Sequence, residues 1–259
     1  MNPRALQQAI VRMMFDPAFA AAVHGRRALP GLAEDERALL RGVDRRAFAT
    51  DRFRRARAVQ ALVEEYPVSA AAIGLAAVDA FLSAPEFHAC VAGRGAMALA
   101  FATWLKDQAS GVGLIEGAMA RLRRVAVADA PAPADALLCG PRFAALIVPA
   151  GTLDWYEATL AWLGAAPLRR LADHGPRPGL PRRGLTRRQG EEYLLLEARA
   201  DGGMDLGTAS EALVRLLRHA EQPRPRRALE AEAVTRGAAA HEAAEVIDEL
   251  LADGLLVTR

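Results

Sequence analysis

Apolar residues recur every three or four positions through the first half of this chain, whereas shorter apolar runs appear in the second half. The first spacing is that of amphipathic helices. Asn2-Pro3 and Asp16-Pro17 place a capping side chain before a proline, which is typical of helix starts. The pattern therefore predicts an all-helical N-terminal part.

Two features of these helices predict which residues form their core. Phe101 and Trp104 lie in a segment rich in Ala and Gly, which allows close helix contacts, so both rings are expected to pack in a core. A helix that begins with the acidic run 34–36 is expected to bury Leu39, Leu40 and Val43.

Residues 191–206 predict a β-hairpin. The run 193–199 is apolar and too short for a helix, and 201–203 reads Asp-Gly-Gly, which favours a turn. Residues 204–206 then form the return strand. Thr208 and Glu211 have the spacing of a capping box, so a helix is expected to start there.

Three helices and a short strand are predicted after this hairpin. Leu213, Leu216, Leu217 and Ala220 form one apolar stripe. Further helices are expected over about 227–236 and 240–252, where Gly254 provides a left-handed stop, and 255–257 adds a strand.

A composition change near residue 130 predicts two domains. Residues 128–135 are rich in Ala and Pro, as in a stiff connector, so we expect a helical domain over 1–128 and a second domain over 136–259. The second also contains an apolar strand at 143–148. Its segment 174–190 carries five arginines and no acid, and is either a solvated loop or a basic contact for an acidic partner.

The predicted α+β order fits either a winged-helix DNA-binding module or a peptide-binding module with an open strand edge. The whole chain carries 33 basic and 31 acidic residues, but residues 191–259 carry 8 and 14, a net charge of 8 − 14 = −6. Outward positions of the last helix hold acids, where DNA phosphates require Lys or Arg. Charge therefore favours the peptide-binding module over a transcriptional regulator.

Three sequence motifs in this region carry a resemblance. They are D-G-x-x-x-L at 201–206, A-L-x-x-L-L at 212–217 and E-L-L-A-D-G-L-L-V at 249–257. Together they resemble the PqqD-like recognition element of ribosomally synthesised and post-translationally modified peptide (RiPP) biosynthesis. Such an element is a small winged-helix-like domain that binds leader peptides.

Two N-terminal segments extend the resemblance over nearly the whole chain. These are E-E-Y-P-V-S-A-A-A-I-G at 64–74 and R-G-A-M-A-L-A-F-A-T-W-L at 94–105. The chain resembles the MbnC-like partner subunits of multinuclear non-haem iron oxygenases (MNIOs). This resemblance implies a heterodimer with such an oxygenase and a ribosomal precursor peptide as the second partner, without nucleic acid or membrane.

The resemblance also implies where the leader peptide binds. The leader peptide is expected to add a strand to the hairpin edge at Met204, Asp205 and Leu206. The last helix is expected to provide the other wall of the groove, with an apolar floor and an acidic rim formed by Val246, Leu250, Glu242, Glu245 and Glu249.

Catalytic motifs are absent from the sequence. The five histidines are far apart, and neither a phosphate loop nor a nucleophile elbow is present. We therefore expect a non-catalytic chain without a cofactor of its own, with iron in the partner oxygenase. A stand-alone enzyme using dispersed residues such as His88, Tyr66 and Glu64 is the remaining alternative.

Cysteine content and hydropathy bear on the compartment. The chain has two cysteines without C-x-x-C spacing, and its longest apolar run is far shorter than the roughly 20 residues of a spanning helix. A cytoplasmic protein without a membrane segment is expected.

Overall fold

The computed structural model describes residues 2–25, 29, 31–44, 52–106, 111–124, 136–173 and 190–258. It is a mixed α+β protein with two small antiparallel sheets, which confirms the predicted class. The chain forms two compact units, the first comprising Met1–Ala109 with Glu157–Pro181 and the second Ser110–Tyr156 with Arg182–Arg259.

These units differ from a simple division of the chain near residues 128–135. Helix α10 (Val112–Leu122) belongs to the second unit, where it packs on sheet strands. Helix α11 (Thr152–Leu163) begins in the second unit and ends in the first. The connector 128–135 and residues 174–189 of the basic segment lie outside the described residues.

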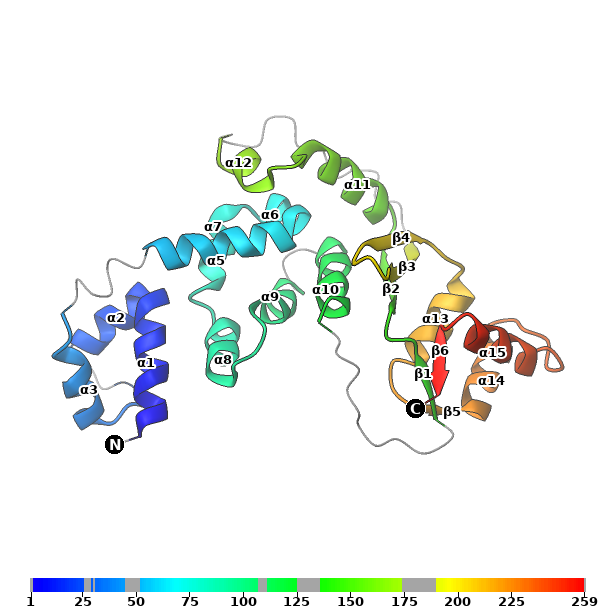
Figure 1. Ribbon diagram of the computed structural model, residues 1–259, viewed down its shortest axis with the longest axis horizontal. Helices are drawn as coiled ribbons and strands as arrows, with labels where there is room; N and C mark the ends of the chain where they lie inside the picture. Colours follow the sequence, from blue (N-terminus) through cyan, green and yellow to red (C-terminus); the bar gives the residue numbers. More distant parts are fainter. Residues whose placement is uncertain are drawn as a thin grey trace. The chain divides into compact units, whose positions relative to one another are not determined.

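The first unit begins with three short helices around a small apolar core. They are α1 (Pro3–Phe15), α2 (Pro17–His24) and α3 (Glu34–Arg41) (Figure 1). Asn2 and Asp16 cap α1 and α2, as predicted, by accepting hydrogen bonds from backbone N–H groups. The buried residues of this core are Ala9, Met13, Val23 and Leu40.

A buried arginine joins α3 to the end of α2. Arg37, 2% exposed, donates from Nε to Val23 O (3.0 Å) and from Nη2 to Ala22 O (3.1 Å) and Gly25 O (2.7 Å). The last carbonyls of a helix have no intrahelical partner, and a cation there also complements the helix dipole. Arg41 adds bonds to Val23 O and Gly25 O.

The remaining helices of the first unit surround an aromatic core. Tyr66, Phe81 and Phe101 are fully buried and meet edge to face, while Trp104 stacks on Phe101 at 23°. The predicted core role of Phe101 and Trp104 is thus confirmed. The helices are α5 (Arg52–Glu65), α6 (Pro67–Ile73), α7 (Leu75–Phe81), α8 (Pro85–Gly93), α9 (Met97–Leu105) and α12 (Pro167–Ala172).

The second unit contains both sheets and the three C-terminal helices. One sheet has the order β5-β1-β6 and the other β2-β3-β4. The strands are β1 (Ala136–Cys139), β2 (Phe143–Pro149), β3 (Glu191–Ala198), β4 (Met204–Thr208), β5 (Arg224–Pro225) and β6 (Leu256–Thr258). The helices that follow β4 are α13 (Glu211–His219), α14 (Arg226–Thr235) and α15 (Ala243–Ala252).

The sheet β2-β3-β4 is covered on both faces by helices. Tyr193 and Leu195 of β3 pack toward α13, in a core that includes Leu217. The alternate residues Leu194 and Leu196 are fully buried on the opposite face, where α10 packs on β2 and β3. Figure 1 shows α10 and α13 on opposite sides of these strands.

Two local sequence predictions are wrong. Thr208 is the last residue of β4, and the cap of α13 is Ser210, whose Oγ accepts from Leu213 N at 3.2 Å. Leu40 of α3 is buried as predicted, but Leu39 of the same helix is 54% exposed, and Val43, which follows the helix, is 36% exposed. The three-helix core is too small to cover more than one stripe of α3.

No single helix within the described ranges is both long and apolar enough to cross a bilayer. The neighbouring helices α7 and α8 reach that length and composition only together, with a 49° bend between them.

Candidate functional site

Strand β4 has one backbone edge paired with β3 and one edge open. Arg199 N donates to Gly203 O (2.9 Å) and Ala209 N to Tyr193 O (2.9 Å), so the odd-numbered positions between them face β3. The intervening residues Met204, Leu206 and Thr208 direct their N–H and C=O groups away from β3. In the described part of the chain these outward groups have no hydrogen-bond partner.

The hairpin turn is fixed by local interactions. Gly202 adopts φ +84°, and Gly203 N donates to Asp201 Oδ1 at 2.8 Å. Arg199 pairs with Asp201 (3.3 Å) and with Asp205 of β4 (3.2 Å). These turn contacts therefore help to fix the register in which β4 pairs with β3.

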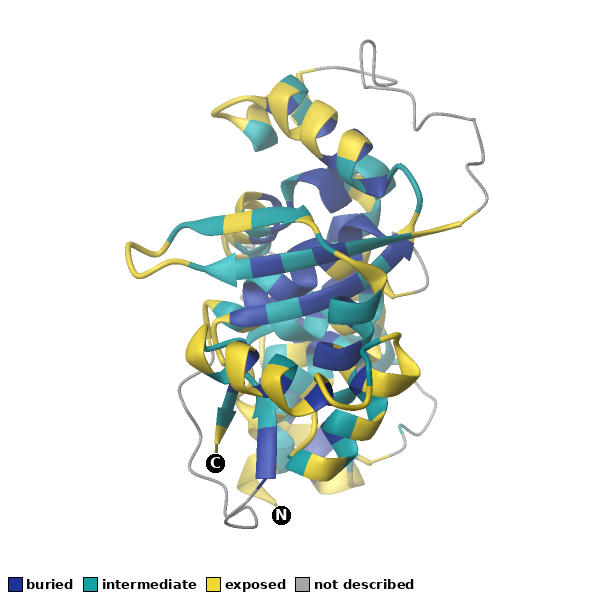
Figure 2. Ribbon diagram, turned by 90° about the vertical axis from the view of Figure 1, so that its right-hand side faces the viewer, coloured by how far each residue is buried: buried dark blue, intermediate teal, exposed yellow. Residues whose placement is uncertain are grey.

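The predicted edge residues lie on both faces of the sheet. Met204 and Leu206 pair with Ala198 and Leu196, so their half-buried side chains lie on the α10 face. Asp205 is exposed on the α13 face. In Figure 2 the β3–β4 hairpin projects with β4 half-buried or exposed, whereas β3 carries the buried positions.

The residues predicted to form the α15 wall of the groove lie partly in the core and partly on the surface. Leu250 is 8% exposed and belongs to the core around α13, with Val246 packed against that core. The acids are exposed: Glu242 precedes α15, and Glu245 and Glu249 lie along it. The main neighbours of α15 are α14 and β6, and among the described residues no hydrogen bond or ion pair joins α15 to β4.

The acidic surface of α15 is partly neutralised by one arginine. Arg226 of α14 donates to Asp248 Oδ1 (2.7 Å), Glu230 Oε1 (2.8 Å) and Ala244 O (3.0 Å). The hydrogen bond from Arg226 lowers the pKa of Asp248. Glu245 and Glu249 lie on the exposed surface of this helix, where acidic side chains oppose DNA phosphates.

Sequence reasoning missed a polar cluster on the α13 face of the sheet. Arg215 donates to Glu191 (2.8 Å), Glu211 (2.7 Å) and the Tyr193 hydroxyl (3.0 Å), while that hydroxyl donates to Glu191 (2.9 Å). The hydrogen bond from Arg215 lowers the pKa of Glu211. The Glu211–Arg215 spacing of four residues was visible in the sequence, but their contact with β3 required the fold.

Two of the dispersed residues considered for an enzyme make hydrogen bonds inside the first unit. Tyr66 is fully buried and donates to Ala98 O at 2.7 Å, and the exposed Glu64 accepts from Gln60 at 2.8 Å. Burial raises the pKa of the Cys139 thiol to about 12, which disfavours the nucleophilic thiolate. Among the described side chains, no group of three or more His, Cys, Asp and Glu is arranged to hold a metal ion.

A scan against protein-family models gives no match, and a search of curated proteins likewise gives none. The geometry of β4 and its surroundings therefore provides the structural argument for function.

Proposed function

We propose that this chain is a non-catalytic partner protein that binds a ribosomal precursor peptide as an added strand on β4. In this proposal it presents the peptide to a multinuclear non-haem iron oxygenase. The observation that carries the peptide-binding step is the open edge of β4, where the N–H and C=O groups of Met204, Leu206 and Thr208 face away from β3.

An open strand edge favours an extended peptide for a physical reason. Unpaired N–H and C=O groups template another strand, and main-chain hydrogen bonds then give affinity while side-chain contacts give specificity. Met204 and Leu206 offer apolar side chains to alternate residues of such a peptide on one face. Asp205, paired with Arg199, offers a carboxylate on the other.

Charge supports a leader peptide with basic flanks. The piece 191–259 has a net charge of 8 − 14 = −6, and Glu242, Glu245 and Glu249 are exposed. Opposite charge steers association and selects partners, although exposed pairs add little affinity. In this proposal the α15 acids attract the flanks of the peptide, and the open edge of β4 holds its centre.

The oxygenase partner is proposed on the resemblance of segments 64–74 and 94–105 to MbnC-like subunits. The iron then resides in the oxygenase, and the reaction takes place in the cytoplasm. The test is to express the chain together with an oxygenase from the same gene cluster. Co-elution at micromolar concentration, with peptide modification that depends on this chain, is the expected result. Separate elution together with equal modification by the oxygenase alone contradicts the proposal.

A further inference from the structure

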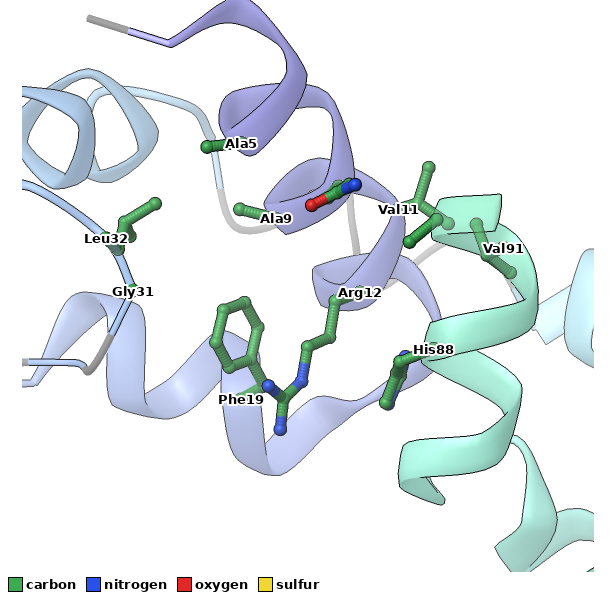
Figure 3. Close-up of a pocket in the computed structure, with 11 residues that line it drawn as sticks. Ala5, Ala9, Val11, Arg12, Phe19, Gly31, Leu32, His88 and Val91 are labelled. Atoms are coloured by element: carbon green, nitrogen blue, oxygen red, sulfur yellow. The ribbon is translucent and has the colours of Figure 1, made fainter. Parts of the chain in front are cut away.

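The first unit contains a cavity of about 200 Å³ between α1, α2 and α8. Its apolar walls include Phe19, Leu32 and Val91, and its polar groups are the side chains of Arg12, Gln8 and His88. Figure 3 shows Arg12 extending from α1 beside the Phe19 ring, with His88 of α8 on its other side. The guanidinium of Arg12, whose side chain is 45% exposed, thus lies at an open pocket with both polar and apolar walls.

The guanidinium of Arg12 is held in place while two of its nitrogens stay available. Its central carbon lies 4.1 Å from the Phe19 ring centroid, and its Nε donates to Asp16 Oδ2 at 3.3 Å. Among the described residues, Nη1 and Nη2 have no hydrogen-bond partner. Stacking and the Asp16 bond orient the guanidinium, so its free side offers paired N–H donors.

Asp16 is occupied by interactions inside the protein. It is 6% exposed, caps α2 through Phe19 N at 3.0 Å and accepts from Arg12. Its Oδ2 lies 3.8 Å from Nε2 of His88, too far for a hydrogen bond, and that buried nitrogen has no hydrogen-bond partner. Asp16 therefore fixes Arg12, while His88 leaves a polar atom unsatisfied beside the cavity.

We propose that this cavity binds a small monocarboxylate with an apolar body of roughly the size of a benzene ring. The carboxylate accepts hydrogen bonds from the two terminal nitrogens of Arg12, the pairing for which a guanidinium fork is suited. The apolar body lies against Leu32 and Val91. An apolar cavity of about 150 Å³ holds benzene, so 200 Å³ accommodates a ring with a carboxylate.

The first test uses benzoate and its uncharged analogue benzamide with the full chain. Backbone amide shifts of the ¹⁵N-labelled protein and calorimetry are recorded during each titration. We expect benzoate to bind with a Kd on the order of 1 mM and to shift amides of α1 and α8. Benzamide is expected to bind at least about tenfold more weakly, because it lacks the charge. Equal binding of the two, or binding of neither, overturns the proposal.

Substitutions then test the anchor. Arg12→Gln is expected to weaken benzoate binding at least about tenfold, whereas Arg57→Gln, the same charge change at an exposed position of α5, leaves it unchanged. Because Arg12→Gln also leaves Asp16 without its cation, circular dichroism checks folding. If that variant is unfolded, Ala5→Leu, which fills the cavity and keeps Arg12, decides the question. Retained benzoate affinity in Ala5→Leu overturns the proposal, and its loss supports it.

Discussion

Leu206 of β4 lies directly opposite Leu196 of β3, in a pair whose backbone groups are not bonded to each other. Leu196 bonds toward β2 instead, and Leu206 directs its N–H to the open side of the sheet. The same residue thus contributes an apolar side chain to one face and a free donor to the edge.

A proline at this position tests strand addition at β4. Leu206→Pro removes the outward N–H while the inward bonds of Asp205 and Gly207 to β3 remain. We expect the affinity for the leader peptide to fall by on the order of 1–3 kcal/mol, because a strand partner loses its donor. Calorimetry with the precursor peptide measures the change.

The matched control is Gly207→Pro, which removes an inward donor. This substitution is expected to loosen the hairpin itself, seen as lost amide protection in β3 and β4. Wild-type affinity in a folded Leu206→Pro variant means that the peptide docks elsewhere, and β2, at the opposite edge of this sheet, becomes the next strand to examine.

The acidic surface of α15 is tested by charge reversal. Glu245→Arg combined with Glu249→Arg is expected to weaken binding of a basic leader about threefold and to reduce its salt dependence, because both carboxylates are exposed and screened by salt. A leader with its Lys and Arg residues replaced by Gln serves as the control and should bind both proteins equally. Unchanged affinity and salt dependence for the basic leader exclude α15 from the site.

Removing the buried Arg37 is expected to destabilise the first unit. Arg37→Met removes the three hydrogen bonds from Arg37 to the carbonyls of Ala22, Val23 and Gly25, although Arg41 still donates to the last two; the expected cost is about 2–4 kcal/mol in the free energy of unfolding. Urea unfolding followed by circular dichroism measures this cost. The nearby exposed Leu39→Ala should change stability little, and an equally small effect of Arg37→Met contradicts the capping role.

Ser210→Ala tests the observed start of α13. Its Oγ accepts from Leu213 N, so its loss is expected to destabilise the second unit by about 0.5–2 kcal/mol. Thr208→Ala, at the position expected from the sequence alone, should cost less because Thr208 lies in β4. A larger loss from Thr208→Ala than from Ser210→Ala would falsify this assignment.

The stability of the first unit should depend on pH through the titration of His88. Burial, followed by the neighbouring Arg12, lowers its pKa below 6.5, although Asp16 and a backbone hydrogen bond at Ser83 act in the opposite direction. The unfolded chain therefore binds a proton below pH 6.5 that the folded protein still excludes. Stability is full above pH 6.5 and falls as the pH drops toward the lowered pKa.

This dependence is measured by urea unfolding at a series of pH values for the wild type and for His88→Gln. The wild type should lose more stability than the variant between pH 7 and pH 5.5, and imidazole resonances should give the folded pKa directly. Parallel pH profiles, or a folded pKa above 6.5, contradict the prediction.

The sequence by itself determined the local elements of the second unit. Its apolar periods and turn residues gave the hairpin 193–206 and three helices at nearly their observed places, because these signals act within a few residues. The cap of α13 was misplaced since Thr208 and Ser210 are both capping residue types. Only the strand pairing shows that Thr208 still belongs to β4, where it lies opposite Leu194 of β3.

Tertiary structure decided every relationship between distant segments. The pairing of β1 with β5 and β6 and the membership of α10 in the second unit depend on contacts between residues far apart in sequence. The candidate site likewise depends on contacts between residues far apart in sequence. Sequence placed Met204 and Leu206 in a strand, but their open edge follows from the register with β3, and the burial of Leu250 follows from the packing of α15. Local free energies select helix, strand and turn, whereas register and burial are set by the packed core as a whole.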